Sequence, residues 1–156
     1  MKTDRRKSRE LALQALFSFR MQNDDEEESP KYLPEIKHEL ISSRKVKKHV
    51  AEYAVALADE TIKHAREFDK EIDKAADNWD LDRFSMVDRM LIHLALTEIR
   101  YMENVPGNIA INEALEIAKD FSSDESVPFI NGVLDSVYKR WLKEGIVFSS
   151  APNAKK

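Results

Sequence analysis

Glu35 and His38 form the one Glu-x-x-His pair of the sequence, a spacing that carboxylate di-metal bundles use to place both ligands on one helical face. Such a centre needs a second pair, and the other histidines, His49, His64 and His93, have none at ligand spacing. The chain contains no cysteine, so thiolate ligands and a thiolate nucleophile are excluded. We therefore expect no metal ion.

Sequence motifs for hydrolysis or phosphoryl transfer are also missing. The chain has no glycine-rich phosphate loop and no nucleophile elbow. Pairs of carboxylates are expected by chance among its 29 Asp and Glu residues. The residue types favour a binding protein, without a cofactor, over an enzyme.

Positive charge is concentrated at the amino terminus, in Lys2, Arg5, Arg6, Lys7 and Arg9. The whole chain has a net charge of −4, so any binding of nucleic acid must come from a local basic patch. Basic residues at the start of a helix oppose the helix macrodipole, so helix stability does not explain the cluster. A solvated tail that only aids solubility is the alternative explanation.

Asp24 to Glu28 is a run of five acids, followed by Ser29 and Pro30. This composition is typical of an exposed loop. The loop could screen the basic amino terminus, but an ordinary solvated linker is the simpler interpretation.

Apolar residues recur at helical spacing along most of the chain, and no useful stretch alternates apolar and polar residues. The pattern predicts an all-α protein with about seven helices. The predicted helical segments cover residues 10–22, 34–41, 46–79 as one long or two nearly continuous helices, 85–104, 108–121 and 128–144.

Several residues mark where these helices begin and end. Ser85 and Asp88 approximate a capping box, and Pro128 suits the first turn of a helix. Gly145 is a natural residue to follow a helix. Gly132 lies inside the last helix, where its cost of about 1 kcal/mol relative to alanine suggests close packing.

The chain of 156 residues has the size of one compact domain, and we expect two packed helical subdomains, 1–78 and 79–148, with a frayed tail at 149–156. No apolar run is long enough to span a membrane. The basic start is not followed by a small-residue cleavage site, which argues against a secretory signal. We expect a cytoplasmic protein.

Three stretches resemble, in order and spacing, the NusB family of bacterial transcription antitermination factors. They are RRKSRELALQALF at residues 5–17, WDLDRFSMVDRMLIHLALTEI at 79–99 and AINEALEIAKDFSSDESVPFINGVLD at 110–135. The combination of INEA, AK-x-F and F-I-NGVLD at these separations is specific. Residues 22–75 match only in helical character.

The resemblance implies a non-enzymatic protein of two helical bundles that binds the boxA element of ribosomal RNA transcripts. It also implies a heterodimer with NusE, which is a small-subunit ribosomal protein, within the antitermination complex of RNA polymerase. In this interpretation the basic side chains contact phosphates, and aromatic rings stack on unpaired bases beside Lys119. The residues concerned are Arg5, Arg6, Lys7, Arg9, Phe17, Lys119, Phe121 and Phe129. Core packing is the alternative role of the three phenylalanines.

Three positions depart from the family pattern. His93 stands where arginine is common, Ser122 where glycine usually follows AK-x-F, and Phe17 where tyrosine is frequent. These three positions lie in the expected RNA site. We therefore expect the departures to change the affinity for RNA or the base preference of the site. The resemblance places Asp88 and Arg89 on the NusE-binding surface, and an ordinary charged helix face is their alternative role.

Other functions compete with RNA binding. The domain could be a protein adaptor or a dimerisation module, including a homodimer, with an incidental basic arm. A similar helical domain precedes the catalytic domain in a family of ribosomal RNA cytosine methyltransferases, but this sequence ends at Lys156 without room for that domain.

Overall fold

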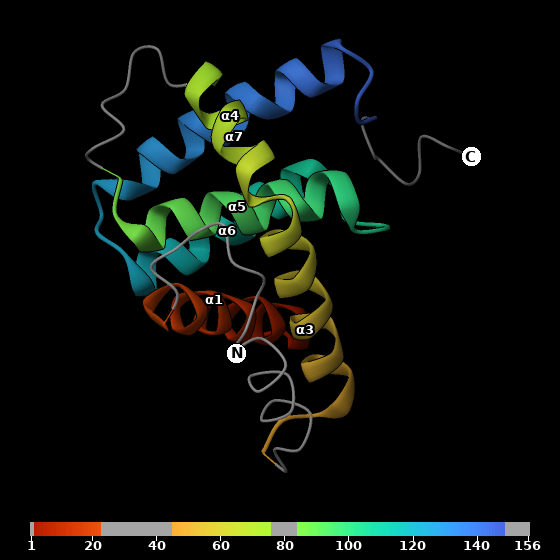
Figure 1. Cartoon of the computed structure of the whole chain (residues 1–156), viewed down its shortest axis with the longest axis vertical. Helices are drawn as coiled ribbons and strands as arrows, with labels where there is room; N and C mark the ends of the chain where they lie inside the picture. Colours follow the sequence, from red (N-terminus) through yellow and green to blue (C-terminus); the bar gives the residue numbers. More distant parts are fainter. Residues whose placement is uncertain (1, 23–44, 76–83, 149–156) are drawn as a thin grey trace. The chain divides into compact units, whose positions relative to one another are not determined.

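The computed structural model describes residues 2–22, 45–75 and 84–148, and all regular secondary structure in these ranges is helical (Figure 1). This confirms the all-α prediction. The predicted segment 34–41, with Glu35 and His38, and the acidic run 24–28 lie outside the described residues. The helices are α1 (Asp4–Gln22), α3 (Lys48–Lys63), α4 (Ala65–Ala75), α5 (Met86–Tyr101), α6 (Gly107–Phe121) and α7 (Ser126–Lys143).

Helices α3 and α4 are the two nearly continuous helices that the spacing allowed, beside one long helix, over residues 46–79. His64 separates them, and its carbonyl oxygen accepts a hydrogen bond from the backbone N–H of Phe68 at 3.1 Å. The chain divides at this break into two compact units, Met1–Lys63 and His64–Lys156. The boundary expected after residue 78 falls in a segment outside the description, and α4 belongs with the carboxyl-terminal helices because it packs on α5 and α7.

The first unit is built on the packing of α1 against α3. Their buried side chains are often small, which permits a close approach of the two backbones. The Ser8 hydroxyl donates a hydrogen bond to the Val50 carbonyl at 2.8 Å and links the two helices. The buried alanines of this pair are Ala12, Ala15, Ala51, Ala54 and Ala58.

Helix α5 is the centre of the second unit, where α4, α6 and α7 pack against it (Figure 1). Every residue from Met90 to Glu98 is buried, so this helix is covered on all sides. The largest buried ring in the described ranges is that of Trp141 in α7, at 0% exposure. Among the described residues, no helix is long and apolar enough to cross a membrane.

Two predicted helix ends of the second unit are confirmed, whereas α5 ends at Tyr101, three residues before the predicted end at 104. Ser85 and Asp88 form the capping box at the start of α5. Gly145, with φ of 71°, ends α7 in a Schellman motif, in which its N–H donates to the Leu142 carbonyl at 3.2 Å. The N–H of Ile146 donates to the Trp141 carbonyl at 2.9 Å and completes the motif.

Gly107, the first residue of α6, lies close to the ring of Tyr138 in α7. A Cβ atom at this position would lie 2.3 Å from the Cζ atom of Tyr138 in α7. The absence of a side chain therefore lets the tyrosine ring cover the start of α6.

Candidate nucleic-acid interface

Four of the basic residues of the amino terminus, Arg5, Arg6, Lys7 and Arg9, lie in the first turns of α1, whereas Lys2 precedes this helix. The Thr3 hydroxyl accepts a hydrogen bond from the backbone N–H of Arg6 at 3.1 Å and caps this helix. Lys2, Arg5 and Lys7 are exposed and Arg6 is half-buried. The helix thus presents the charges of Arg5, Arg6 and Lys7 in fixed positions.

Arg9 differs from the other basic residues because its side chain is buried, with 6% of the residue exposed. A buried guanidinium is not available for a phosphate contact in the described structure. The basic surface of α1 is therefore made by the residues before Arg9.

Arg5 stacks on the ring of Tyr53 in α3, with its Cζ atom 3.6 Å from the ring centroid. Stacking holds the guanidinium plane in place and leaves its N–H edge able to donate to two oxygens of one anion. This geometry suits a phosphate contact.

A second group of basic residues joins this surface from the start of α3. Lys47 Nζ lies 3.5 Å, and His49 Nε2 2.8 Å, from Asp4 Oδ2 in the first turn of α1. The hydrogen bond with His49, together with the charge of Lys47, lowers the pKa of Asp4. Asp4 remains ionised and holds the two basic groups together.

Phe17 also lies on α1, with 41% of the residue exposed. Its ring is thus open to an external partner, unlike the buried leucines at positions 13 and 16. This exposure is compatible with stacking on a base.

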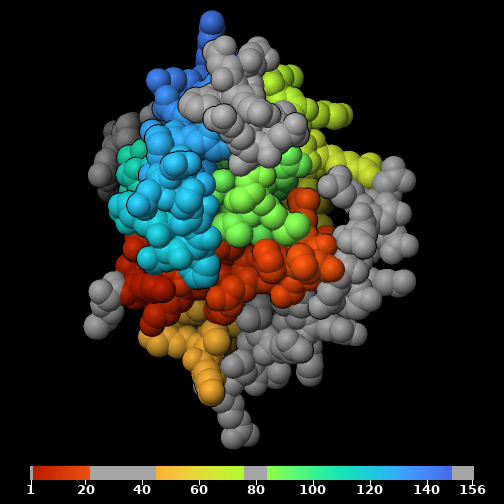
Figure 2. Space-filling model, turned by 90° about the vertical axis from the view of Figure 1, so that its left-hand side faces the viewer, coloured from red at the N-terminus to blue at the C-terminus, as the bar shows by residue number. Residues whose placement is uncertain are grey.

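Four other candidate RNA residues, Lys119, Phe121, Ser122 and Phe129, lie in the second unit at the connection between α6 and α7. In Figure 2 the light-blue atoms of this region lie beside the green atoms of the start of α5. Phe121 is 39% exposed, and Lys119 is exposed with its Nζ 3.1 Å from Glu116 Oε1. Phe129 is half-buried and meets the ring of Phe84 edge to face, with centroids 3.8 Å apart.

The side chain of Ser122 makes a hydrogen bond within the second unit. Its hydroxyl donates to Asp88 Oδ1, and the hydroxyl of Ser126 donates to Asp88 Oδ2 at 2.9 Å. The capping carboxylate of α5 therefore also fixes the turn that carries Phe121. A glycine at position 122 could not make this hydrogen bond. The hydrogen bond is therefore a structural reason for the serine at the position where the family usually has glycine.

Asp88 and Arg89, the two expected partner contacts, differ in exposure. Only 3% of Asp88 is exposed, and its carboxylate points into the unit toward the serines. Arg89 is half-buried and follows Met86, which is 42% exposed, on the same helix. Arg89 is thus the more accessible of the two.

His93 lies in the interior of the second unit, at 1% exposure, rather than on an open surface. Its Nε2 atom is 2.8 Å from Asp69 Oδ1 in α4, and its ring contacts that of Phe68 with centroids 5.9 Å apart. Direct RNA contact by His93 does not agree with this placement, because α4 covers the ring.

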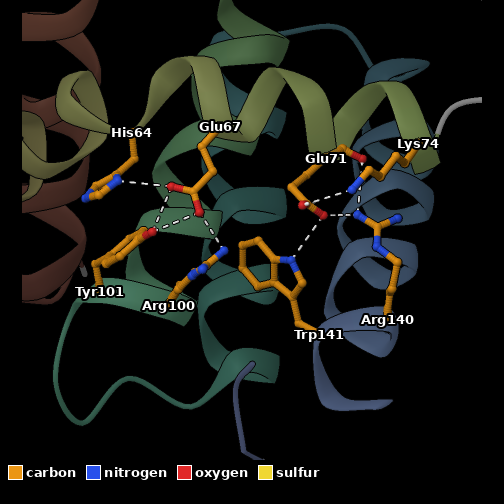
Figure 3. A network of polar contacts seen from close by, with 8 residues as sticks. All are labelled: His64, Glu67, Glu71, Lys74, Arg100, Tyr101, Arg140 and Trp141. Carbon is orange, nitrogen blue, oxygen red and sulfur yellow. Dashed lines mark hydrogen bonds and ion pairs between the residues drawn. The ribbon is translucent and has the colours of Figure 1, made fainter. Parts of the chain in front are cut away.

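A row of polar contacts, which no sequence motif indicated, holds α4 on its neighbours (Figure 3). Glu67 accepts a hydrogen bond from the Tyr101 hydroxyl at 2.7 Å and pairs with Arg100. The rings of His64 and Tyr101 stack with centroids 3.7 Å apart. One turn further along α4, Glu71 begins a second set of contacts.

Glu71 pairs with Arg140 and accepts a hydrogen bond from Trp141 Nε1 at 3.1 Å (Figure 3). The spacing of Glu67 and Glu71 puts both carboxylates on one helical face, which is the only sequence signal for these contacts. Their partners lie far away in the sequence. Among the described residues no group of acidic residues and histidines has the arrangement of a metal site.

Comparison with known proteins connects this geometry to one family. The model of the NusB family matches residues 6–139. The chain is 33% identical over 146 residues to the transcription antitermination protein NusB of Chloroherpeton thalassium, covering 94% of this chain and 66% of that protein. It is 38% identical over 133 residues to the protein of the same name from Desulfitobacterium hafniense, covering 85% and 86% of the two chains.

Solved structures agree with the sequence comparison. The structure of T. maritima NusB matches with a TM-score of 0.73 and 30% identity, covering 89% of this chain and 93% of that one. A structure of the antitermination factors NusB and NusE in complex with dsRNA matches with a TM-score of 0.71 and 25% identity, over 90% of this chain and 99% of that one. The chain belongs to the NusB family.

Proposed function

We propose that this protein is an RNA-binding transcription antitermination factor that recognises boxA-type RNA in ribosomal RNA transcripts together with NusE. Membership of the NusB family and the likeness to NusB in its complex with NusE and RNA support the proposal. The observation that carries it is the exposed basic surface on the first turns of α1, in a chain with a net charge of −4.

The charges of α1 supply the sequence-independent part of binding. Arg5, Arg6 and Lys7 contact phosphates, and their placement at the positive end of a helix costs helix stability that an RNA partner offsets. Arg9, which is buried, supports this helix and acts on RNA only through the position of its neighbours.

Stacking supplies the preference for single-stranded RNA. Phe17 and Phe121 are exposed enough to stack on bases, and Phe129 offers its half-buried ring beside Phe84. Lys119 adds positive charge near Phe121. Ser122 and His93 act indirectly, because their polar atoms are used inside the second unit.

The start of α5 is the proposed contact for NusE. Arg89 and the exposed Met86 provide a charged and an apolar contact, and Asp88 fixes the helix start on which both are carried. The same protein acts in the cytoplasm, within the antitermination complex of RNA polymerase, as a binding protein and not as an enzyme.

Titration of a boxA-containing RNA into this protein, with and without NusE and at several salt concentrations, tests the proposal. We expect the protein to bind the boxA RNA more tightly than an RNA of another sequence. NusE should strengthen this binding and salt should weaken it. A scrambled RNA of equal length is the control. Equal binding of both RNAs, or no binding even with NusE present, would favour a protein adaptor or a homodimerisation module instead. Sedimentation of the free protein then tests whether it forms a homodimer.

A further inference from the structure

A group of basic residues at the start of α3 continues the basic surface of α1. This α3 group consists of Lys45, Lys47, Lys48 and His49. The ranges 2–10 and 45–52 together contain eight Lys and Arg residues against three Asp and Glu residues, a net charge of +5, whereas the whole chain has a net charge of −4. In Figure 2 the orange atoms of this part of the chain lie beside the red atoms of α1. Positive charge is therefore concentrated in one region of the first unit.

Two contacts join the α3 group to the first turns of α1. Asp4 pairs with Lys47 and His49, so these two residues position the group and do not serve as its ligand contacts. Arg5 stacks on the ring of Tyr53, about one turn further along α3. The two contacts hold the start of α3 beside the proposed phosphate contacts of α1.

Lys45 and Lys48 are the lysines of the group that Asp4 does not hold. Both residues are exposed, and 88% of the Lys48 side chain is accessible. Lys48 Nζ lies 3.8 Å from Glu52 Oε1, and an exposed pair of this kind contributes little, so Lys48 can exchange it for a phosphate. A lysine is a point charge on a flexible stem, which suits a phosphate contact that requires no fixed orientation.

The composition of this surface fits a phosphate backbone better than a protein partner. The centre of a protein interface is depleted of lysine and depends on aromatic or arginine side chains that fill a pocket. No large apolar residue is exposed in the range 45–52, all of which is described, since Val46 is half-buried and Val50 is buried. Lysines that neutralise phosphates, in contrast, gain affinity from the release of counterions without an apolar contact.

We propose that RNA bound at the first turns of α1 continues onto the start of α3, where Lys45 and Lys48 contact phosphates of nucleotides that flank boxA. This inference rests on the proposed RNA-binding function and adds a segment of RNA to it. Contacts to phosphate position a nucleic acid but carry no base information, so the flanking nucleotides can have any sequence. The α3 group lies outside the stretches of the sequence that resemble the NusB family.

Fluorescence anisotropy in the presence of NusE tests the proposal. It compares a minimal boxA RNA with the same RNA extended by a short uridine tract at one end or at the other. We expect one of the two extensions to strengthen binding to the wild type. Two phosphate contacts on a single strand add about 1.4 to the salt slope, so the gain in affinity should be about sevenfold larger at about 50 mM than at about 200 mM salt. A cytidine tract of the same length should give the same gain.

The variant Lys45→Ala with Lys48→Ala should abolish the gain from the extension and leave the affinity for the minimal RNA nearly unchanged. Arginine at both positions keeps the two charges and should keep the gain. The matched control is Lys63→Ala with Lys139→Ala, which removes the same charge from exposed positions at the other end of α3 and on α7. This control should also keep the gain.

Equal affinities of the wild type for the minimal and both extended RNAs would overturn the proposal. A gain that the double alanine variant keeps, or that the control variant loses to the same extent, would overturn it too. In each of these cases, binding of the minimal boxA RNA leaves the proposed function intact. If neither the minimal nor the extended RNAs bind with NusE present, the proposed function and this extension of it are both rejected.

Discussion

The hydroxyl of Ser126, in the first turn of α7, donates a hydrogen bond to Asp88 Oδ2, in the first turn of α5, at 2.9 Å. The same carboxylate closes the capping box with Ser85 and accepts from Ser122. One buried side chain therefore fixes both the proposed partner surface of α5 and the turn that carries Phe121. The two proposed binding regions of the second unit share this support.

Replacement of Asp88 by alanine is expected to lower the free energy of unfolding by about 2–4 kcal/mol, because it removes a helix cap and leaves two hydroxyls without their acceptor. Urea denaturation gives this quantity. Asp124→Ala changes an exposed carboxylate in the neighbouring turn and should stay within about 0.5 kcal/mol of the wild type. Equal effects of the two changes would contradict the role given to Asp88.

Gly107→Ala is expected to destabilise the second unit by about 1–3 kcal/mol, the usual cost of overpacking, because the new Cβ meets the Tyr138 ring. Denaturation of the single variants and of Gly107→Ala with Tyr138→Ala measures the coupling between the two positions. We expect the double variant to lose less stability than the two single changes predict together. Additive effects would mean that the ring is not the obstacle.

The contacts of Glu71 predict a third stability effect. Glu71→Ala leaves the Arg140 guanidinium and the Trp141 indole N–H without this acceptor, so we expect a decrease of about 2–3 kcal/mol in the free energy of unfolding. Asp135→Ala breaks an exposed pair with Lys139 on α7 and is expected to cost under about 1 kcal/mol. A decrease in Glu71→Ala as small as that in Asp135→Ala would show that α4 is held mainly by its apolar side chains, Phe68 and Ile72.

Local signals were enough to predict the helices and several of their ends. Ser85 and Asp88 lie three residues apart, so the capping box depends only on neighbouring residues. Gly145 likewise ends α7 through contacts within one turn. The same local rules do not locate the acceptor of Ser126, because Asp88 is 38 residues away in the sequence.

Exposure of the candidate site residues was the least predictable property. The sequence offered Phe17, Phe121 and His93 for RNA contact alike, yet the first two are about two-fifths exposed and His93 is buried. The difference comes from α4, whose Asp69 pairs with His93. Packing of this helix depends on Glu67 and Glu71 meeting distant partners, which periodicity does not encode.

Asp4 predicts a pH dependence in the first unit. The hydrogen bond with His49 lowers the pKa of Asp4 in the folded protein below the ordinary pKa of 3.8. The stabilisation by this carboxylate is therefore present above pH 3.8 and disappears as the pH falls through the lowered pKa. NMR titration should find the Asp4 pKa below 3.8 in the wild type and closer to 3.8 in His49→Ala. An unchanged pKa in the variant would exclude His49 as the cause.

The basic surface of α1 gives the most direct prediction about function. Replacing Arg5, Arg6 and Lys7 together by alanine should weaken binding of boxA RNA and flatten its salt slope by about 2, because each phosphate contact on a single strand contributes about 0.7. The temperature of thermal unfolding should change little, since stacking of Arg5 on the Tyr53 ring stabilises the fold by only about 0.5–1 kcal/mol at an exposed site.

A variant with Lys63, Lys70 and Lys143 replaced by alanine removes the same charge from exposed positions of α3, α4 and α7. This variant distinguishes an effect of the net charge of the molecule on RNA binding from an effect of the local basic surface of α1. If RNA affinity depends on net charge alone, both triple variants weaken binding equally. If the first turns of α1 bind the phosphates, only the α1 variant changes the salt slope, whereas a large decrease of stability in that variant would make these residues structural.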